Sequence, residues 1–250
     1  MISFYDTSTL PTEDMLEAMR QARLGDDVYH EDPTVNELEA LSAQMLNKEA
    51  AIFMPSGTMS NLVAVMCHTQ HGDEVVVEAE AHVMYYETGG IAAVAGVMPL
   101  AIQGERGVLR AEQIEPKLRK PNPHYPRTTL LCIENTHNRG GGTIINLQIM
   151  RELRGLCDRW GLRLHVDGAR IFNAAVALNV PVSDLAADAD SIWFALSNDR
   201  PLFAFAGLWA SWRGLRGPKS APVDGEHQLF GFLTRNRTRS LRRSTPRQCQ

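Results

Sequence analysis

The sequence lacks the patterns by which several classes of protein are recognised. No stretch has the length of a membrane span and no basic-then-apolar leader opens the chain, so we expect a cytoplasmic protein without a membrane partner. The motifs C-x-x-C, H-E-x-x-H and G-x-G-x-x-G are absent, and no metal site is predicted. The 250 residues contain four cysteines without close pairing, and three stand in apolar or helical contexts typical of reduced core thiols: Cys67, Cys132 and Cys157.

Acidic residues prevail along most of the chain, whereas its last part is basic. The formal net charge is −4, which gives no general reason to expect a nucleic-acid partner. From Asn198 to Gln250, however, nine arginines and one lysine stand against three acidic residues, a local charge of +7. The preceding 197 residues therefore carry −11. This asymmetry predicts a basic tail.

Apolar periodicity predicts strands that alternate with helix-length segments. We expect helices that begin near residues 11, 33, 61 and 147, and strands over 50–54, 74–77, 93–100, 128–133, 162–166 and 191–196. A capping box between Thr34 and Glu37 is expected at the second helix. The alternation is typical of βαβ units, so the fold class is α/β, with a mostly parallel sheet and helices on both faces. Ligands of such sheets lie outside the carboxyl ends of the strands.

The stretch His165-Val166-Asp167-Gly168-Ala169-Arg170 ends an apolar run and delivers an aspartate to one edge of this sheet. A buried aspartate is costly unless it has a cationic partner. In one cofactor class that partner is the ring nitrogen of pyridoxal phosphate, which the carboxylate keeps protonated so that the ring accepts electrons from a substrate. Arg170 is suited to clamp a carboxylate or a phosphate. The alternative is a surface Asp-Gly turn beside an arginine.

Other polar groups also follow predicted strands. The Ser-Gly-Thr turn at 56–58 precedes a helix whose first N–H groups can hold a phosphate, although a serine there often serves only as an N-cap. His82 offers a flat imidazole for stacking on a planar ring, or else a structural hydrogen bond. The polar loop 134–138 either lines a pocket or merely connects two elements. His124, among prolines, is a candidate proton carrier.

Together these motifs resemble the threonine aldolases, which are pyridoxal-phosphate enzymes with the aspartate-aminotransferase-like fold, fold type I. The likeness covers residues 1–197 almost without interruption, in the family's order. It is carried by Asp6-Thr7, Pro11-Thr12, Gly25-Asp26-Asp27-Val28-Tyr29, Glu31-Asp32-Pro33-Thr34, Pro55-Ser56-Gly57-Thr58-Met59, Gly72-Asp73-Glu74, His82 with Tyr86-Glu87, Pro126-Arg127-Thr128, Glu134-Asn135-Thr136-His137-Asn138 and His165 through Asn173. The resemblance implies a three-layer large domain over 1–197 that binds pyridoxal phosphate, in a homo-oligomer, tetramer or dimer, whose sites are shared across an interface.

The resemblance also implies an activity and a set of site residues. The family splits threonine or allo-threonine into glycine and acetaldehyde, with pyridoxal 5'-phosphate as cofactor. His82 would stack on the cofactor ring, and Asp167 would pair with the ring nitrogen. The implied cofactor-binding residues are Ser56, Gly57, Thr58, His82, Asp167 and Arg170. The implied substrate-binding residues are Tyr29, Glu87, His124 and Arg170, with His82 and His124 in catalysis and Tyr29 reaching a neighbouring subunit's site.

One departure from the family affects the centre of the chemistry. The family's cofactor-attaching lysine directly follows a serine at the end of the strand that here ends in Ser197, and this chain has Asn198 in its place. An amide nitrogen is not a nucleophilic amine, so impaired activity is expected. The resemblance ends at the same point. Residues 198–250 lack the family's small C-terminal domain and are predicted to form an atypical, poorly ordered basic tail, the product of a shifted reading frame or an alternative splice.

Four other interpretations stay open beside the impaired aldolase. Lys219 could replace the missing lysine and sustain the lyase activity. The chain could be a non-catalytic, cofactor-binding variant that associates with full-length subunits. It could be a binding protein that uses its tail arginines on nucleic acid or an acidic membrane. It could also support β-elimination or racemisation, because the same electron sink serves those reactions.

Overall fold

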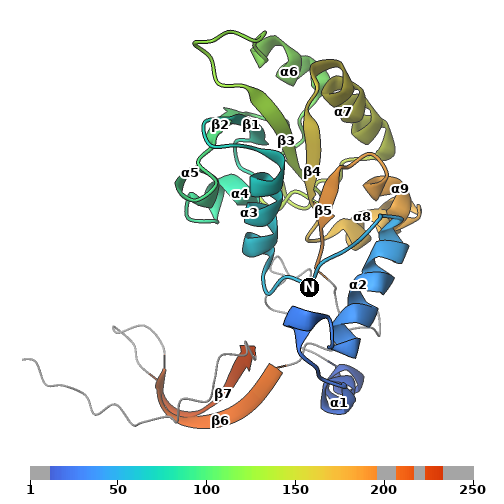
Figure 1. The fold of residues 1–250 in the computed structure, drawn as a ribbon, viewed down its shortest axis with the longest axis vertical. Coiled ribbons are helices and arrows are strands. Elements are labelled where there is room, and N and C mark those ends of the chain that lie inside the picture. Colours follow the sequence, from blue (N-terminus) through green and yellow to red (C-terminus); the bar gives the residue numbers. More distant parts are fainter. Residues whose placement is uncertain (1–11, 196–206, 217–222, 233–250) are drawn as a thin grey trace, which may run out of the picture. The chain divides into compact units, whose positions relative to one another are not determined.

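The structure is a computed structural model that describes residues 12–195, 207–216 and 223–232 (Figure 1). The chain divides into two compact units, Met1–Ala204 and Phe205–Gln250. This division lies a few residues beyond the boundary between 197 and 198 at which the resemblance to the family ends. All the predicted site residues that the structure describes belong to the first unit.

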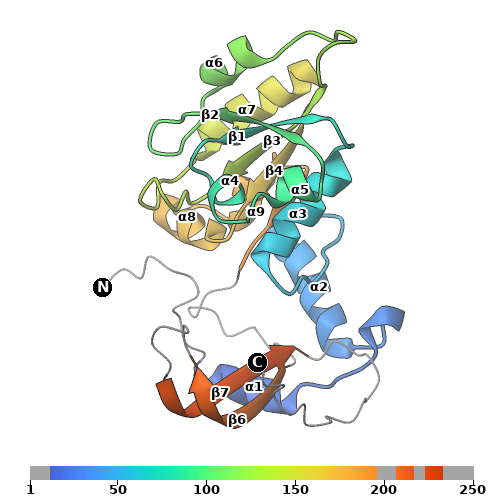
Figure 2. The same cartoon turned by 90° about the vertical axis from the view of Figure 1, so that its left-hand side faces the viewer.

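A five-stranded sheet forms the centre of the first unit (Figures 1 and 2). Its strands are β1 (Glu74–Glu78), β2 (Met98–Ile102), β3 (Thr128–Glu134), β4 (Arg163–Asp167) and β5 (Ser191–Trp193). They lie in the order β2-β1-β3-β4-β5, and each neighbouring pair is parallel. The valine run of β1 is buried along its whole length, as expected of a parallel strand covered on both faces. The predicted parallel α/β sheet is confirmed.

Helices cover both faces of the sheet, so the first unit has three layers. Val76 packs with α7 in one apolar cluster, whereas Val75 and Val77 pack with α3 and α5 in another, because alternate strand residues point to opposite faces. The described helices are α1 (Glu13–Gln21), α2 (Pro33–Leu46), α3 (Gly57–His68), α4 (His82–Tyr85), α5 (Gly90–Ala93), α6 (Ala111–Ile114), α7 (Leu147–Trp160), α8 (Ile171–Leu178) and α9 (Val182–Ala186), with 3-10 turns η2 (Asp27–Tyr29) and η3 (Glu115–Lys117). None of them is long and apolar enough to cross a membrane.

The start of α2 differs from the predicted capping box. Asp32 is the N-cap, and its Oδ1 accepts hydrogen bonds from the backbone N–H groups of Thr34 and Val35. The hydroxyl of Thr34 instead donates to the carbonyl of Arg23, which ties the helix to the preceding loop. The helix begins at Pro33, where the missing N–H costs nothing. The sequence prediction placed the cap two residues too late because a stronger capping residue precedes the proline.

The predicted strand over 50–54 is wrong, because this segment is irregular. The backbone N–H of Phe53 donates to Glu39 Oε1 of α2 rather than to a neighbouring strand. Ile52 is 71% exposed, so the apolar run does not enter the core. The segment crosses the surface and delivers the chain to α3. A short apolar run alone does not distinguish a buried strand from such a crossing.

Two of the three cysteines predicted as core thiols are buried. Cys132 lies in β3 and Cys157 in α7, and burial raises the pKa of the Cys157 thiol to about 12. Cys67 is exposed instead, which corrects the prediction for that residue. It stands at the penultimate position of α3, whose sequence is apolar on nearly every side although only one face packs on the sheet.

The second unit contains an antiparallel pair of strands that periodicity did not predict. β6 (Gly207–Arg216) pairs with β7 (Val223–Phe232) in a continuous register from Gly207 opposite Phe232 to Arg216 opposite Val223. Asn198, Lys219 and the arginine-rich run 234–239 lie outside the described residues. The poor order that the sequence predicts for 198–250 therefore stays a prediction.

Candidate active site

Buried acidic side chains converge at the carboxyl ends of the central strands. Glu78 ends β1, Glu134 ends β3 and Asp167 ends β4, and all three are almost fully buried. The register places Glu134 directly opposite Asp167. Three carboxylates in a dry region repel one another unless donors or cations face them. This edge of the sheet is therefore the place where a cationic group would be held.

Asp167 is held by two hydrogen bonds to its carboxylate. Asn61 Nδ2 donates to Oδ2 at 2.9 Å, and the backbone N–H of Ala169 donates to Oδ1 at 3.3 Å. Burial, followed by the charge of Glu134, raises the pKa of Asp167 to about 7, against the two hydrogen bonds and the charge of His82. A permanent cation beside this carboxylate would relieve that penalty.

His82 lies beside Asp167 at the start of α4. Its backbone N–H donates to Glu134 Oε2 at 2.8 Å, and its Nδ1 is 2.8 Å from Glu87 Oε1. The hydrogen bond with Glu87 raises the pKa of His82; burial opposes this shift, and the charge of Asp167 adds to it. The ring is tilted against Tyr86, with centroids 5.4 Å apart. Polar atoms of His82, Glu87 and Asp167 all lie within 4.8 Å of one another.

The Ser-Gly-Thr turn leads into the long helix α3 as predicted, but the helix already begins at Gly57, four residues before the predicted start near 61. Ser56 is its N-cap, and its Oγ accepts a hydrogen bond from the backbone N–H of Met59 at 3.2 Å, so the capping interpretation holds for this hydroxyl. Gly57 lies against the Trp193 indole: a methyl group there would stand 2.2 Å from Cη2. The Nε1 donor of Trp193 is buried without a hydrogen-bond partner in the part of the chain that the structure describes. No sequence motif marks Trp193 as a site residue.

The loop after β3 is firmly held, so it is more than a flexible connection. The Asn135 side chain donates to the carbonyl of Ile145 and accepts from the backbone N–H of the same residue. His137 is fully buried, with its Nε2 2.9 Å from Glu78 Oε2. The prediction identified the loop but gave His137 no role of its own. Only the register of β1 and β3 brings Glu78 next to it.

Arg170 lies at the same edge, at the start of α8. Its guanidinium donates to Asn138 Oδ1 at 3.1 Å, and the backbone N–H of Asn138 donates to Glu134. Arg170 is partly exposed, so its guanidinium forms an accessible, positively charged end of the otherwise buried acidic region. An arginine held in this way is suited to bind a carboxylate.

The likeness to known proteins agrees with this geometry. Residues 4–201 match the beta-eliminating lyase family. The chain belongs to that family. It is 44% identical over 196 residues to low-specificity L-threonine aldolase 1 of Arabidopsis thaliana, covering 77% of this chain and 55% of that protein. It is 42% identical over 193 residues to the low specificity L-threonine aldolase of Escherichia coli K12, covering 77% and 57%.

A solved structure of Leishmania major threonine aldolase has the same fold, with a TM-score of 0.67 at 25% identity over 76% of this chain and 56% of that one. The predicted resemblance to threonine aldolases and the predicted fold are confirmed. The family is dependent on pyridoxal 5'-phosphate. The chain spans about half the length of the curated relatives that it matches.

His124, which the family resemblance implies, does not lie at this edge of the sheet in its own chain. His124 precedes β3, at the amino end of the sheet, whereas Asp167 stands at the carboxyl end of β4. The seven residues of β3 span about 23 Å, so a single chain does not bring His124 to Asp167. Tyr29, in η2, is 72% exposed. Asn198, the position of the absent lysine, lies outside the described residues.

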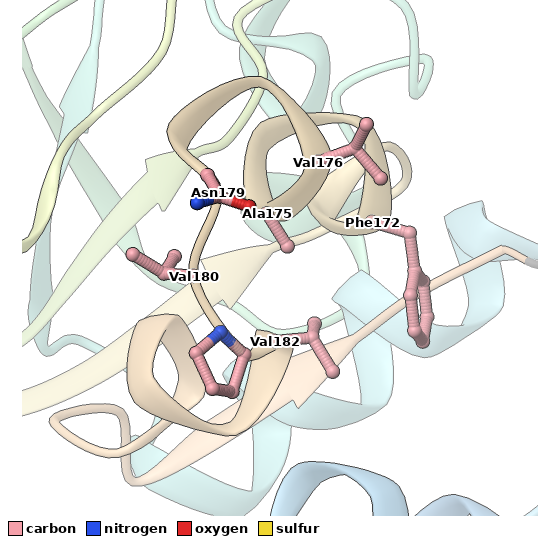
Figure 3. A pocket seen from close by; sticks show the side chains of 7 residues that line it. Phe172, Ala175, Val176, Asn179, Val180 and Val182 are labelled. Carbon is pink, nitrogen blue, oxygen red and sulfur yellow. The ribbon is translucent and has the colours of Figure 1, made fainter.

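A separate pocket opens between α8 and α9 (Figure 3). The side chains of α8 and of the turn into α9 surround it: Phe172, Ala175, Val176, Asn179, Val180, Pro181 and Val182. None of the site residues that the family resemblance implies lines it. Val176 is largely exposed at its rim. The sequence analysis did not predict this pocket, because its lining faces belong to two helices that only the fold brings together.

Proposed function

We propose that this chain is a threonine aldolase-like protein that binds pyridoxal 5'-phosphate without covalent attachment and has aldolase activity at or near background. The observation that carries the cofactor proposal is Asp167, a buried carboxylate with a raised pKa and no arginine or lysine among its described hydrogen-bond partners. A protonated pyridine nitrogen supplies the positive charge that this carboxylate lacks.

The described residues fit the cofactor at both ends. Asp167 would pair with the ring nitrogen, and His82 would cover one face of the ring. The first N–H groups of α3, at Gly57 and Thr58, would hold the phosphate, since the N-terminus of a helix favours anions. Asn61, which holds Asp167, follows Gly57 by one helical turn, about 6 Å along α3. One helix would therefore contribute to both ends of the proposed site.

Each protein group has a chemical part in the proposed site. When bound, the cofactor ring accepts the electron pair released as the substrate bond breaks. Asp167 keeps the ring nitrogen protonated, and Arg170 orients the amino-acid carboxylate. Glu87, which the resemblance placed in the substrate site, holds His82 through Nδ1. His124 would reach a substrate hydroxyl only from another subunit, because β3 separates it from Asp167 in its own chain.

The expected loss of activity depends on Asn198. Its amide cannot attack the cofactor aldehyde, so neither covalent attachment nor amine exchange with a substrate is available. We therefore expect glycine and acetaldehyde production from threonine or allo-threonine to be at background. Lys219 would restore it only if its amine reached the same place.

The experiment is to purify the 250-residue chain, add pyridoxal phosphate, and record absorbance and acetaldehyde release from allo-threonine. Borohydride treatment followed by mass spectrometry tests for attachment. We expect bound cofactor in equilibrium dialysis, no covalent adduct and no acetaldehyde above background. The matched control is Asn198→Lys, for which a borohydride-fixed adduct at residue 198 is expected. Clear turnover by the unaltered chain, or an adduct at Lys219, would refute the proposal.

We also propose assembly with a second copy of this chain or with a full-length subunit. The exposed apolar turn at η2 supports it, since Val28 is 79% exposed and precedes the exposed Tyr29. Sedimentation equilibrium should show a dimer or larger assembly, and Val28→Asp should shift it toward the monomer. A monomer at all concentrations would contradict the assembly.

A further inference from the structure

A continuous chain of hydrogen bonds runs from Asp167 to the partly exposed His68. Asn61 Nδ2 is 2.9 Å from Asp167 Oδ2, and Asn61 Oδ1 is 3.0 Å from His165 Nε2. His165 Nδ1 is 2.8 Å from Ser191 Oγ, which in turn is 2.8 Å from His68 Nε2. Asn61, His165 and Asp167 are at most 2% exposed. The chain is therefore shielded from water over its inner half.

Three neighbouring elements supply these side chains. Asn61 and His68 are seven residues apart on α3, and so lie on one face of it. His165 and Asp167 are two residues apart on β4, and so lie on one face of the sheet. Ser191 begins β5, directly opposite His165. The chain therefore fills the seam between α3 and the sheet.

The carboxylates determine the direction of every bond in the chain. Asn61 Nδ2 faces both Asp167 and Glu87 Oε1, and only an N–H₂ group can donate to both. Asn61 Oδ1 therefore accepts from His165, which must carry its proton on Nε2. His165 Nδ1 then accepts from the Ser191 hydroxyl, whose oxygen in turn accepts from Nε2–H of His68.

The buried histidine of the hydrogen-bond chain carries no charge. Burial lowers the pKa of His165 to about 3, so this ring is neutral throughout the physiological range. Burial likewise lowers the pKa of His68. All four donors thus point toward Asp167 without adding a cation that would compete with a ligand for it. Asn61 is the last donor of the hydrogen-bond chain, and its N–H₂ group points at the Asp167 carboxylate.

We propose that Asn61 is a positioning residue for Asp167, and that the Asn61–His165–Ser191–His68 chain holds the carboxylate oriented for a ring N–H. The inference rests on the proposed binding of pyridoxal phosphate. The same Asn61 Nδ2 group also donates to Glu87 Oε1, so it lies between the carboxylates of Asp167 and Glu87. Glu87 is in turn the hydrogen-bond partner of His82. Loss of the amide would leave two buried carboxylates facing each other and free Asp167 to rotate away from the ring.

The first test compares two probes, pyridoxal phosphate and its 1-deaza analogue, which has carbon in place of the ring nitrogen. The ratio of their dissociation constants isolates the contact with Asp167, because changes in overall stability or in phosphate binding affect both probes. We expect the unaltered chain to prefer pyridoxal phosphate by about tenfold or more. Asp167→Asn and Asn61→Leu should both bring the ratio close to one. Asn36→Leu, a control on α2, should leave it unchanged.

The second test needs no cofactor and detects the hydrogen-bond chain directly. Nitrogen-15 NMR of the cofactor-free chain should show His165 as the Nε2–H tautomer at pH 6 to 8. Ser191→Ala removes one hydroxyl far from the ring, so it is expected to fold. It should loosen the tautomer preference and lower the probe ratio by about threefold.

The outcomes separate the two proposals. If the unaltered chain binds neither probe, the proposed function is refuted, and the inference with it. If the unaltered chain discriminates between the probes and Asn61→Leu discriminates equally well, the inference alone is refuted. A His165 with its proton on Nδ1 in the unaltered chain would also overturn the inference, whatever the cofactor result.

Discussion

Replacing Asp167 by asparagine is expected to stabilise the cofactor-free chain at pH 8. Burial, and then the charge of Glu134, raise the pKa of Asp167 from 3.8 to about 7 in the folded state. Between these values the folded state binds a proton that the unfolded state has released, so stability falls as the pH rises from about 4 to about 7. The full difference between the pKa values of the unfolded and folded states corresponds to a loss of about 4 kcal/mol of folding stability at pH 8.

The net gain is smaller, because asparagine loses one contact. Its amide oxygen still accepts from Asn61, but its NH₂ group cannot accept from the backbone N–H of Ala169. Losing that bond costs about 1 kcal/mol. Asp167→Asn should therefore raise the free energy of unfolding by about 3 kcal/mol at pH 8 and by less than about 1 kcal/mol at pH 5. The same change should weaken the binding of pyridoxal phosphate.

Urea denaturation at pH 5 and pH 8, followed by far-ultraviolet circular dichroism, measures both values. The informative quantity is the difference between the two pH values, since it removes any pH-independent effect of the substitution. If Asp167→Asn is as stable as the unaltered chain or less stable at pH 8, the carboxylate does not carry the buried charge from which its role is inferred.

Three further substitutions test other parts of the first unit. Gly57→Ala should destabilise the chain by about 1–3 kcal/mol in urea denaturation, since its methyl group meets Trp193 at 2.2 Å; unchanged stability would show that the indole is not held there. Asp32→Ala should cost about 1–2 kcal/mol by removing the α2 cap, and Asp32→Asn should recover most of this. Burial opposes the shift, but hydrogen bonds from Leu164 and two arginines lower the pKa of Asp190 to about 2. Asp190→Asn should therefore lower the free energy of unfolding by about 1 kcal/mol at pH 7 and by little at pH 2. An equal loss of stability at both pH values would contradict the charge argument.

Most strands and the candidate carboxylate were predictable because their signal is local, whereas the strand predicted over 93–100 begins only at Met98, after α5. Asp167 ends an apolar run, and the alternation of strands with helix-length segments places it at the carboxyl edge of a parallel sheet. The turn at Ser56-Gly57 was predictable for the same reason, although α3 begins within it and not near residue 61. The strand prediction for 50–54 failed because a short apolar run has the length of a strand whether or not it pairs with one. No local feature of the sequence shows which segments lie beside it.

The residues missed in the site depend on pairing between elements. Glu78 and His137 are 59 residues apart, and the register of β1 with β3 brings them together. Asn61 reads as an ordinary polar position of an apolar helix until α3 is packed on β4. The role of His124 stays a prediction: the direction of β3 places it at the far edge of its own sheet, so it requires a second subunit.

Helix α3 contains both the turn proposed to hold the phosphate and the Asn61 amide that donates to Asp167. A rigid helix does not stretch, so the spacing between the two proposed contacts is constant, and we expect it to select ligands by their length. Compounds with a longer or shorter arm between ring and phosphate should be rejected even when each end alone is well matched.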